Sequence, residues 1–183
     1  DEFLGDHTQR YNLYYVYVDL PSGKGYNIDD EQIKLPVRKK IADEQCLVWD
    51  TDQRPAAVGP SICLDENDSP HFLLPVSEET PLDSAFYFVK HRAGEWEKTR
   101  ITKTLHPFNA SCLQLDKQGV FHAYMITGSG VSIVGEDMDE YGWGQRVENW
   151  ISSDGGNGWI QAQDLTPKPG MRYQNIQFVS DGQ

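Results

Sequence analysis

Cysteine, cationic residues and long apolar runs are all scarce in this sequence of 183 residues. The three cysteines form an odd set without a Cys-x-x-Cys pair, and Cys63 and Cys112 sit inside apolar runs. We therefore expect buried free thiols rather than a disulfide framework or a zinc site. No apolar run approaches the length of a membrane span, and no signal peptide opens the chain.

Positive charge is the second shortage. Sixteen Lys and Arg oppose 28 Asp and Glu, which gives a formal net charge of −12. Nucleic acids and anionic membranes need a basic surface, so neither is expected as a partner. If the ligand is itself anionic, the cations that bind it have to be concentrated locally.

Aromatic and turn-forming residues are abundant, and no stretch has the pattern of a long helix. Aromatic residues make up 11% of the chain, beside 16 glycines and 10 prolines. This mixture favours many short strands. We expect an all-β fold.

An internal repeat indicates which all-β fold this is. A strand at 61–65 and a second beginning at 70 recur at 111–116 and 120–125, and in both copies an Asp lies six residues before a His. A second hairpin follows each copy. Units of four strands that recur in this way are typical of β-propeller blades. The predicted segments are the outer half of one blade at about 6–40, two whole blades at 55–103 and 108–166, and the first strand of another at 173–183. In the outer half blade, a strand over 11–18 is expected to turn at 21–23 into a second strand near Tyr26.

The two ends of the chain indicate that this single domain, 1–183, is a partial propeller. The first residue is not an initiator Met, and an Asp-Gly hairpin signal at 181–182 is followed by one further residue. We expect the remaining blades to be supplied by another segment or chain. Unpaired strand edges would make the 183 residues alone prone to aggregation.

The segment 152–159 reads Ser-x-Asp-x-Gly-x-Gly-Trp. It resembles the Asp-box of sialidase-like propellers and departs from it where Gly158 replaces Thr. The Asp side chain can cap turn amides and the Trp can pack between blades, so we interpret the segment as structural.

Blade geometry sorts the candidate ligand residues. Turns between the first and second strands, and between the third and fourth, share one face of the disc, while the remaining loops share the other. His71, His91 and His122 lie on the first face and are expected to be structural. The loops of the second face contain the candidate site residues, which are His7, Arg10, Asn12, His106, Tyr141, Trp143, Arg146, Arg172 and Tyr173.

The loop at 127–145 is unusually long and combines aromatic, acidic and basic groups, and long loops are often functional. Its acidic run at 136–140 is either a solvated lid or a cation-binding cluster, with calcium as the candidate ion. Arg146 follows the loop and either pairs with Glu148 or the acidic run, or holds a carboxylate ligand.

Several segments resemble one family. These segments are similar to bacterial BNR-repeat propellers, and they comprise 10–17 with 35–37, 60–65 with 69–71, and 94–96. Within that group the chain is most similar to propeller-type polysaccharide lyases, the ulvan lyases in particular. The resemblance implies a seven-bladed propeller when complete, a secreted or periplasmic location, an acidic polysaccharide as partner, and no required cofactor.

The resemblance also implies β-elimination on a uronate-containing polysaccharide. The uronate carboxylate has to be neutralised before a base can remove the neighbouring proton. His7 or Tyr141 would exchange protons, while Arg10 or Arg146 would hold the carboxylate. Trp143 would stack on a sugar ring. The remaining candidates, Asn12, His106, Arg172 and Tyr173, would bind substrate.

Two alternatives stay open. A sialidase-like glycoside hydrolase needs an Arg triad, for which Arg10, Arg146 and Arg172 are available, and a Tyr-Glu pair, for which Glu140 and Tyr141 are adjacent. A non-catalytic glycan-binding propeller would use the same aromatic loops without a base.

Overall fold

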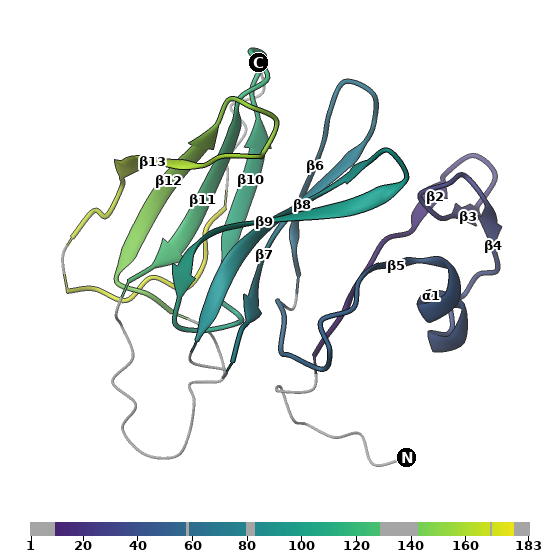
Figure 1. Cartoon of the computed structure of the whole chain (residues 1–183), viewed down its shortest axis with the longest axis horizontal. Helices are drawn as coiled ribbons and strands as arrows, with labels where there is room; N and C mark the ends of the chain where they lie inside the picture. The colour runs from purple at the N-terminus through teal and green to yellow at the C-terminus, as the bar shows by residue number, and fades with distance from the viewer. Residues whose placement is uncertain (1–9, 58, 80–82, 129–142, 169, 178–183) are drawn as a thin grey trace.

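The computed structural model describes residues 10–57, 59–79, 83–128, 143–168 and 170–177. These residues form four antiparallel sheets, of two, three, four and four strands, and one short helix. Figure 1 shows the three units of the chain side by side in chain order. The all-β prediction is confirmed, and none of the described sheets closes on itself.

The two four-stranded sheets each use consecutive strands in chain order. The first contains β6 (Ser61–Leu64), β7 (Pro70–Ser77), β8 (Ser84–Arg92) and β9 (Glu95–Thr104). The second contains β10 (Ser111–Leu115), β11 (Phe121–Thr127), β12 (Arg146–Ser152) and β13 (Ile160–Asp164). Both predicted hairpins of each unit are present with these pairings.

The repeated Asp and His make the same contacts in both sheets, as Asp65 with His71 and as Asp116 with His122. In each copy one carboxylate oxygen accepts hydrogen bonds from the backbone N–H groups two and four residues further on, all at 2.9 Å. The other oxygen of Asp65 or Asp116 lies 3.4 Å from Nε2 of His71 or His122. The Asp therefore closes the turn and also contacts the side chain of the second residue of the next strand.

His71 is built into the core. Its ring is stacked on Phe88 with centroids 5.6 Å apart and meets Phe121 edge-on at 4.9 Å. Burial lowers the pKa of His71, and the nearby Asp65 opposes this shift only in part. A neutral, packed imidazole fits the structural role expected for this histidine.

The first unit differs from its prediction. We expected one continuous strand over 11–18 in a hairpin with the strand near Tyr26. The strand is broken: β1 (Leu13–Tyr14) pairs with β5 (Leu47–Trp49), while β2 (Tyr17–Asp19) forms a three-stranded sheet with β3 (Lys24–Tyr26) and β4 (Gln32–Ile33). The break follows from packing, because Leu13 enters the core while Tyr17 stacks on Tyr26 at 5.2 Å.

In the chain, α1 (Lys39–Gln45) follows β4 and precedes β5, and none of its residues is buried. Lys39 and Lys40 each pair with an acidic residue one turn later, at Asp43 and Glu44. Within the described ranges, no helix is long and apolar enough to span a membrane.

The core consists of two clusters on opposite faces of the β6–β9 sheet. Side chains alternate along β7, so Phe72, Leu74 and Val76 face the cluster that contains Leu13, whereas Leu73 faces the other. β7 is buried along its whole length. The β6–β9 sheet is therefore a central layer with a neighbour on each face.

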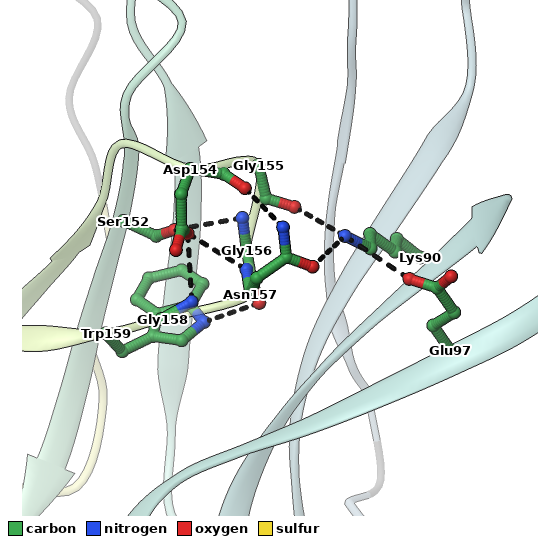
Figure 2. A network of polar contacts seen from close by, with 9 residues as sticks. All are labelled: Lys90, Glu97, Ser152, Asp154, Gly155, Gly156, Asn157, Gly158 and Trp159. Atoms are coloured by element: carbon green, nitrogen blue, oxygen red, sulfur yellow. Dashed lines mark hydrogen bonds and ion pairs between the residues drawn. The ribbon is translucent and has the colours of Figure 1, made fainter.

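A single buried lysine links the two four-stranded sheets (Figure 2). Lys90 on β8 donates hydrogen bonds to the carbonyl of Gly155 and to Oδ1 of Asn157, both at 2.8 Å, and lies 3.3 Å from Glu97. The Gly155 carbonyl and the Asn157 side chain belong to the β12–β13 turn, whereas Glu97 belongs to β9. Their geometry anchors that turn to the neighbouring sheet.

The Ser152–Trp159 turn has the internal bonding expected of a structural segment. Oδ1 of Asp154 accepts hydrogen bonds from the Ser152 hydroxyl at 2.7 Å and the Gly158 N–H at 2.9 Å. Trp159 packs on Phe88 of the neighbouring sheet with ring centroids 5.3 Å apart. The Asp caps the turn and the Trp packs between sheets, as interpreted from the sequence.

The strand predicted at 173–183 is not seen in the part of this segment that is described. Tyr173 forms an isolated bridge with Gly144, and 174–177 have no strand assignment. Residues 178–183 lie outside the described residues.

Candidate functional site

Six of the described candidates lie at one end of the two four-stranded sheets, where β7, β9 and β11 finish and β12 begins: Arg10, His106, Trp143, Arg146, Arg172 and Tyr173. We call this end the loop end. Asn109 holds it together, because its side-chain amide donates to Thr104 Oγ1 at 2.6 Å and to the carbonyl of Ile126 at 3.3 Å. These bonds join the ends of β9 and β11. His7 and Tyr141 lie outside the described residues, so their predicted roles stay predictions.

Trp143, Arg172 and Tyr173 are brought together. The guanidinium carbon of Arg172 lies 4.1 Å from the centroid of the Trp143 ring. Gly144 and Tyr173 exchange two backbone hydrogen bonds, at 3.0 and 2.9 Å, and the Tyr173 hydroxyl donates to the carbonyl of Lys168 at 2.9 Å. The contact is a cation–π pair on a braced backbone.

The burial of Trp143 changes its expected role. Its exposed fraction is 6%, and Arg172 covers its ring. The ring therefore supports the guanidinium rather than presenting an open face on which a sugar could stack. The exposed cation over it is the group that a ligand would meet.

Arg146 begins β12 beside this pair. Its side chain is 60% exposed, and its guanidinium lies 3.8 Å from Oε1 of buried Glu148. The other oxygen of Glu148 accepts a hydrogen bond from the Trp150 indole at 2.9 Å. The position of Arg146 is compatible both with pairing to Glu148 and with a carboxylate ligand, since the contact to Glu148 is long and most of the side chain is exposed.

Arg10 and His106 both lie against the ring of Phe108. The Arg10 guanidinium carbon lies 5.8 Å from the Phe108 ring centroid, and the His106 ring lies 5.3 Å from the same ring. His106 is only 3% exposed, and its Nδ1 accepts a hydrogen bond from the Phe108 N–H at 3.1 Å. This histidine shapes the loop, so the expectation of direct substrate contact is weakened.

Asn12 has a structural position as well. It adopts a positive φ of 66°, its N–H donates to Thr51 Oγ1 at 3.0 Å, and its Oδ1 accepts from the Thr51 N–H at 2.9 Å. Its amide group also donates to the Tyr14 hydroxyl at 3.2 Å. The side chain ties the incoming chain to 51–54 and has little capacity left for a substrate.

Sequence reasoning missed one polar network at the loop end, formed by Glu78, Tyr87 and Arg100. Arg100 donates to both oxygens of Glu78, at 2.7 and 3.0 Å, and the Tyr87 hydroxyl donates to the same carboxylate at 2.7 Å. The bidentate Arg100 lowers the pKa of Glu78 to about 2. Burial, followed by the bond to Glu78, raises the pKa of Tyr87 to about 12.

No metal centre is found in the part of the chain that the structure describes. Within those ranges, no group of three or more His, Cys, Asp or Glu could hold a metal ion. The acidic run at 136–140, which was the candidate for calcium, lies outside the described residues.

Two hollows lie away from the loop end. One of about 820 Å³ lies between the turns that contain Asp65 and Asp116, and another of about 560 Å³ lies beside Tyr15 and Tyr17. Both lie at the other end of the sheets, which contains the β6–β7, β8–β9, β10–β11 and β12–β13 turns and which we call the hairpin-turn end. None of the described candidate residues lines either hollow.

Among solved structures, the chain is similar to a class of polysaccharide lyases. Two structures of PL25 ulvan lyase, one of them bound to -GlcA(1-4)Rha3S-, match 90% of this chain with a TM-score of 0.65 and 16% sequence identity. At this identity the likeness concerns the fold alone. The match covers 34% of those chains, so this chain spans about a third of their length.

Sequence comparison gives a shorter match to the same kind of protein. A segment of 44 residues is 36% identical to the ulvan lyase of Nonlabens ulvanivorans, covering 24% of this chain and 9% of that protein. No protein-family model matches the chain.

Proposed function

We propose that this chain is part of a β-propeller polysaccharide lyase of the BNR and Asp-box type, which cleaves a uronate-containing, ulvan-like polysaccharide by β-elimination. The observation that carries the proposal is the structural likeness over 90% of the chain to an ulvan lyase bound to a glucuronate-containing saccharide. Four-stranded sheets packed side by side in chain order are the arrangement expected of blades.

Three exposed guanidinium groups support an anionic ligand at the loop end. Arg146, Arg172 and Arg10 have exposed side chains, and two of them rest on aromatic rings that hold them in place. In a protein with a net charge of −12, cations placed together at one end favour a polyanion there. Such groups would neutralise the uronate carboxylate and so make the neighbouring proton easier to remove.

Proton transfer in this proposal falls to His7 or Tyr141. A histidine has an ordinary pKa of about 6.5 and can accept a proton near neutral pH, whereas a tyrosine near 10 needs cationic neighbours to do so. Arg146 follows the loop that contains Tyr141 and would supply such a neighbour.

The remaining blades would come from another segment or chain, and the enzyme would act outside the cell or in the periplasm. Ile62 and Leu64 on β6 are 49% and 51% exposed, an unusual state for aliphatic side chains of a sheet. A further pair of inner strands in the first unit would cover this face, as the propeller proposal requires.

Tyr87 and Glu78 form a Tyr-Glu pair of the kind that the hydrolase alternative requires. The surroundings of this pair do not make Tyr87 a nucleophile. Such a mechanism needs the carboxylate to take the phenolic proton. Here Arg100 holds the Glu78 carboxylate and its pKa is lowered to about 2, while that of Tyr87 is raised to about 12. Both shifts keep the proton on Tyr87, so the lyase remains the proposal.

The test uses the intact parent protein incubated with ulvan and other uronate polysaccharides, followed by the ultraviolet absorbance of the unsaturated uronate. We expect absorbance to rise, and we expect Arg146→Ala and His7→Ala each to slow the rise by about tenfold or more. Arg92→Ala, an exposed arginine at the hairpin-turn end, is the control that should leave the rate unchanged. Absence of a rise on every uronate polymer would refute the lyase proposal.

A further inference from the structure

The β12–β13 turn contains an Asn-Gly pair. Asn157 is the only asparagine in the sequence that is followed by glycine. Glycine carries no side chain to shield its backbone nitrogen and moves freely in φ, so this pair is the dipeptide most prone to attack on the asparagine side chain. We propose that Asn157–Gly158 is a site of spontaneous deamidation that the folded turn holds in check, and that modification there loosens the contact between the two four-stranded sheets.

The reaction needs water and no other reagent. The backbone nitrogen of Gly158 loses its proton to solvent and forms a bond to Cγ of Asn157. The Cγ–Nδ2 bond breaks and ammonia leaves, which gives a five-membered succinimide. Water then opens the ring at one of its two carbonyls to give aspartate or isoaspartate, and either product adds one negative charge.

Three hydrogen bonds oppose the first step (Figure 2). The Gly158 N–H donates to Asp154 Oδ1 at 2.9 Å, so the attacking nitrogen is engaged. The Asn157 amide donates to the carbonyl of Asp154 at 2.6 Å, and its Oδ1 accepts from Lys90 Nζ at 2.8 Å. Attack requires the amide to rotate toward Gly158, so these bonds have to break first. The reaction therefore proceeds from a locally opened turn.

The two products, aspartate and isoaspartate at position 157, should differ in their effect on the contact between the sheets. An aspartate at this position places a carboxylate where the Lys90 ammonium already donates, so the contact between sheets is preserved as an ion pair. Isoaspartate adds a carbon to the backbone next to Gly156, on which a Cβ would already lie 2.1 Å from the Phe88 ring. The turn has no room for the extra length, so Trp159 has to move away from Phe88.

The test is a time course on the intact parent protein at mildly alkaline pH, with peptide mapping by mass spectrometry and chromatographic separation of the two isomers. A synthetic peptide spanning 150–161 in the same buffer gives the unprotected rate. We expect Asn157 in the folded chain to react at least about tenfold more slowly than in the peptide, and to match the peptide when the chain is unfolded in urea. Equal rates in the folded chain and the peptide, or an unreactive peptide, would overturn the proposal.

Two variants test the role of the lysine. Lys90→Met removes one protecting bond at similar side-chain length, and it should speed the reaction several-fold. Lys40→Met, at an exposed lysine of α1, should leave the rate unchanged. A rate for Lys90→Met equal to that of the unsubstituted chain would contradict the protective role. If Lys90→Met fails to fold, the comparison of folded chain and peptide still decides the proposal.

The consequence of modification is measured separately. Purified isoaspartate-containing chain should unfold at a lower urea concentration than the unmodified chain, whereas Asn157→Asp should unfold close to it. An isoaspartate form as stable as the unmodified chain would overturn the claim that modification loosens the sheets.

Discussion

The backbone of Gly156 lies against the ring of Phe88, so that a Cβ added to it would stand 2.1 Å from Cε1 of the ring. Gly156 belongs to the β12–β13 turn and Phe88 to β8 of the neighbouring sheet. Gly156 also has a φ of +85°, a conformation that favours glycine. The close approach to Phe88 and the positive φ both require glycine at position 156, where the turn packs directly on the neighbouring sheet.

Gly156→Ala should therefore destabilise the protein by about 3 kcal/mol, the sum of a left-handed alanine and an overpacked contact. The free energy of unfolding in urea measures the effect. Gly155→Ala is the matched control, because Gly155 has a φ of +71° in the same turn but nothing within 4 Å of an added Cβ. It should cost about 1 kcal/mol. Equal losses in the two variants would show that the Phe88 contact contributes nothing.

The Asp–His hairpins allow a graded test. Asp65→Asn keeps an oxygen to accept the turn N–H groups, while Asp65→Ala removes the acceptor and leaves two backbone donors without it. We expect a loss of about 1 kcal/mol or less for Asn and about 2 kcal/mol for Ala. Asp116→Asn and Asp116→Ala should give the same order in the urea unfolding transition. A smaller loss for Ala than for Asn at either site would contradict the assigned role.

The Glu78–Arg100 pair predicts a specific dependence of stability on pH. The pKa of Glu78 is lowered from its ordinary 4.5 to about 2, so the folded state binds its proton less readily than the unfolded state. The contribution of this pair is therefore fully present above about pH 4.5 and is lost as the pH falls toward about 2. Urea unfolding at several pH values, compared between the unsubstituted chain and Glu78→Gln, isolates this contribution.

The difference in the free energy of unfolding between the unsubstituted chain and Glu78→Gln should shrink as the pH falls from about 4.5 to about 2. Glu66→Gln, an exposed carboxylate on a turn, is the control that should follow the unsubstituted chain. A difference that stays constant down to the lower end of the window would contradict the assigned ion pair.

Local signals in the sequence predicted the repeated part of the fold well. The Asp that precedes His by six residues marks a turn whose hydrogen bonds are all local, so the β6–β7 and β10–β11 hairpins follow from their own sequences. The turn at Ser152–Trp159 is also internally bonded. Such features depend on neighbours in the chain and can be seen without tertiary information.

Features that depend on distant contacts were missed. β1 pairs with β5 across more than thirty intervening residues, and α1 has no buried face that would give an apolar period. The Tyr87–Arg100 pairing depends on a register shift between Phe86 and Tyr87. The burial of Trp143 and His106 arises from the packing of their loops, so their residue types alone predicted open binding groups.

The lyase proposal is tested most directly by the fate of oxygen in the products. The intact parent protein is incubated with ulvan in water enriched in heavy oxygen, and the oligosaccharides are analysed by mass spectrometry. β-Elimination breaks the bond without adding water, so the account predicts products with an unsaturated uronate at one end and no heavy oxygen incorporated at cleavage. One heavy oxygen gained for each bond cleaved, in products that contain no unsaturated sugar, would identify a hydrolase and contradict the proposal.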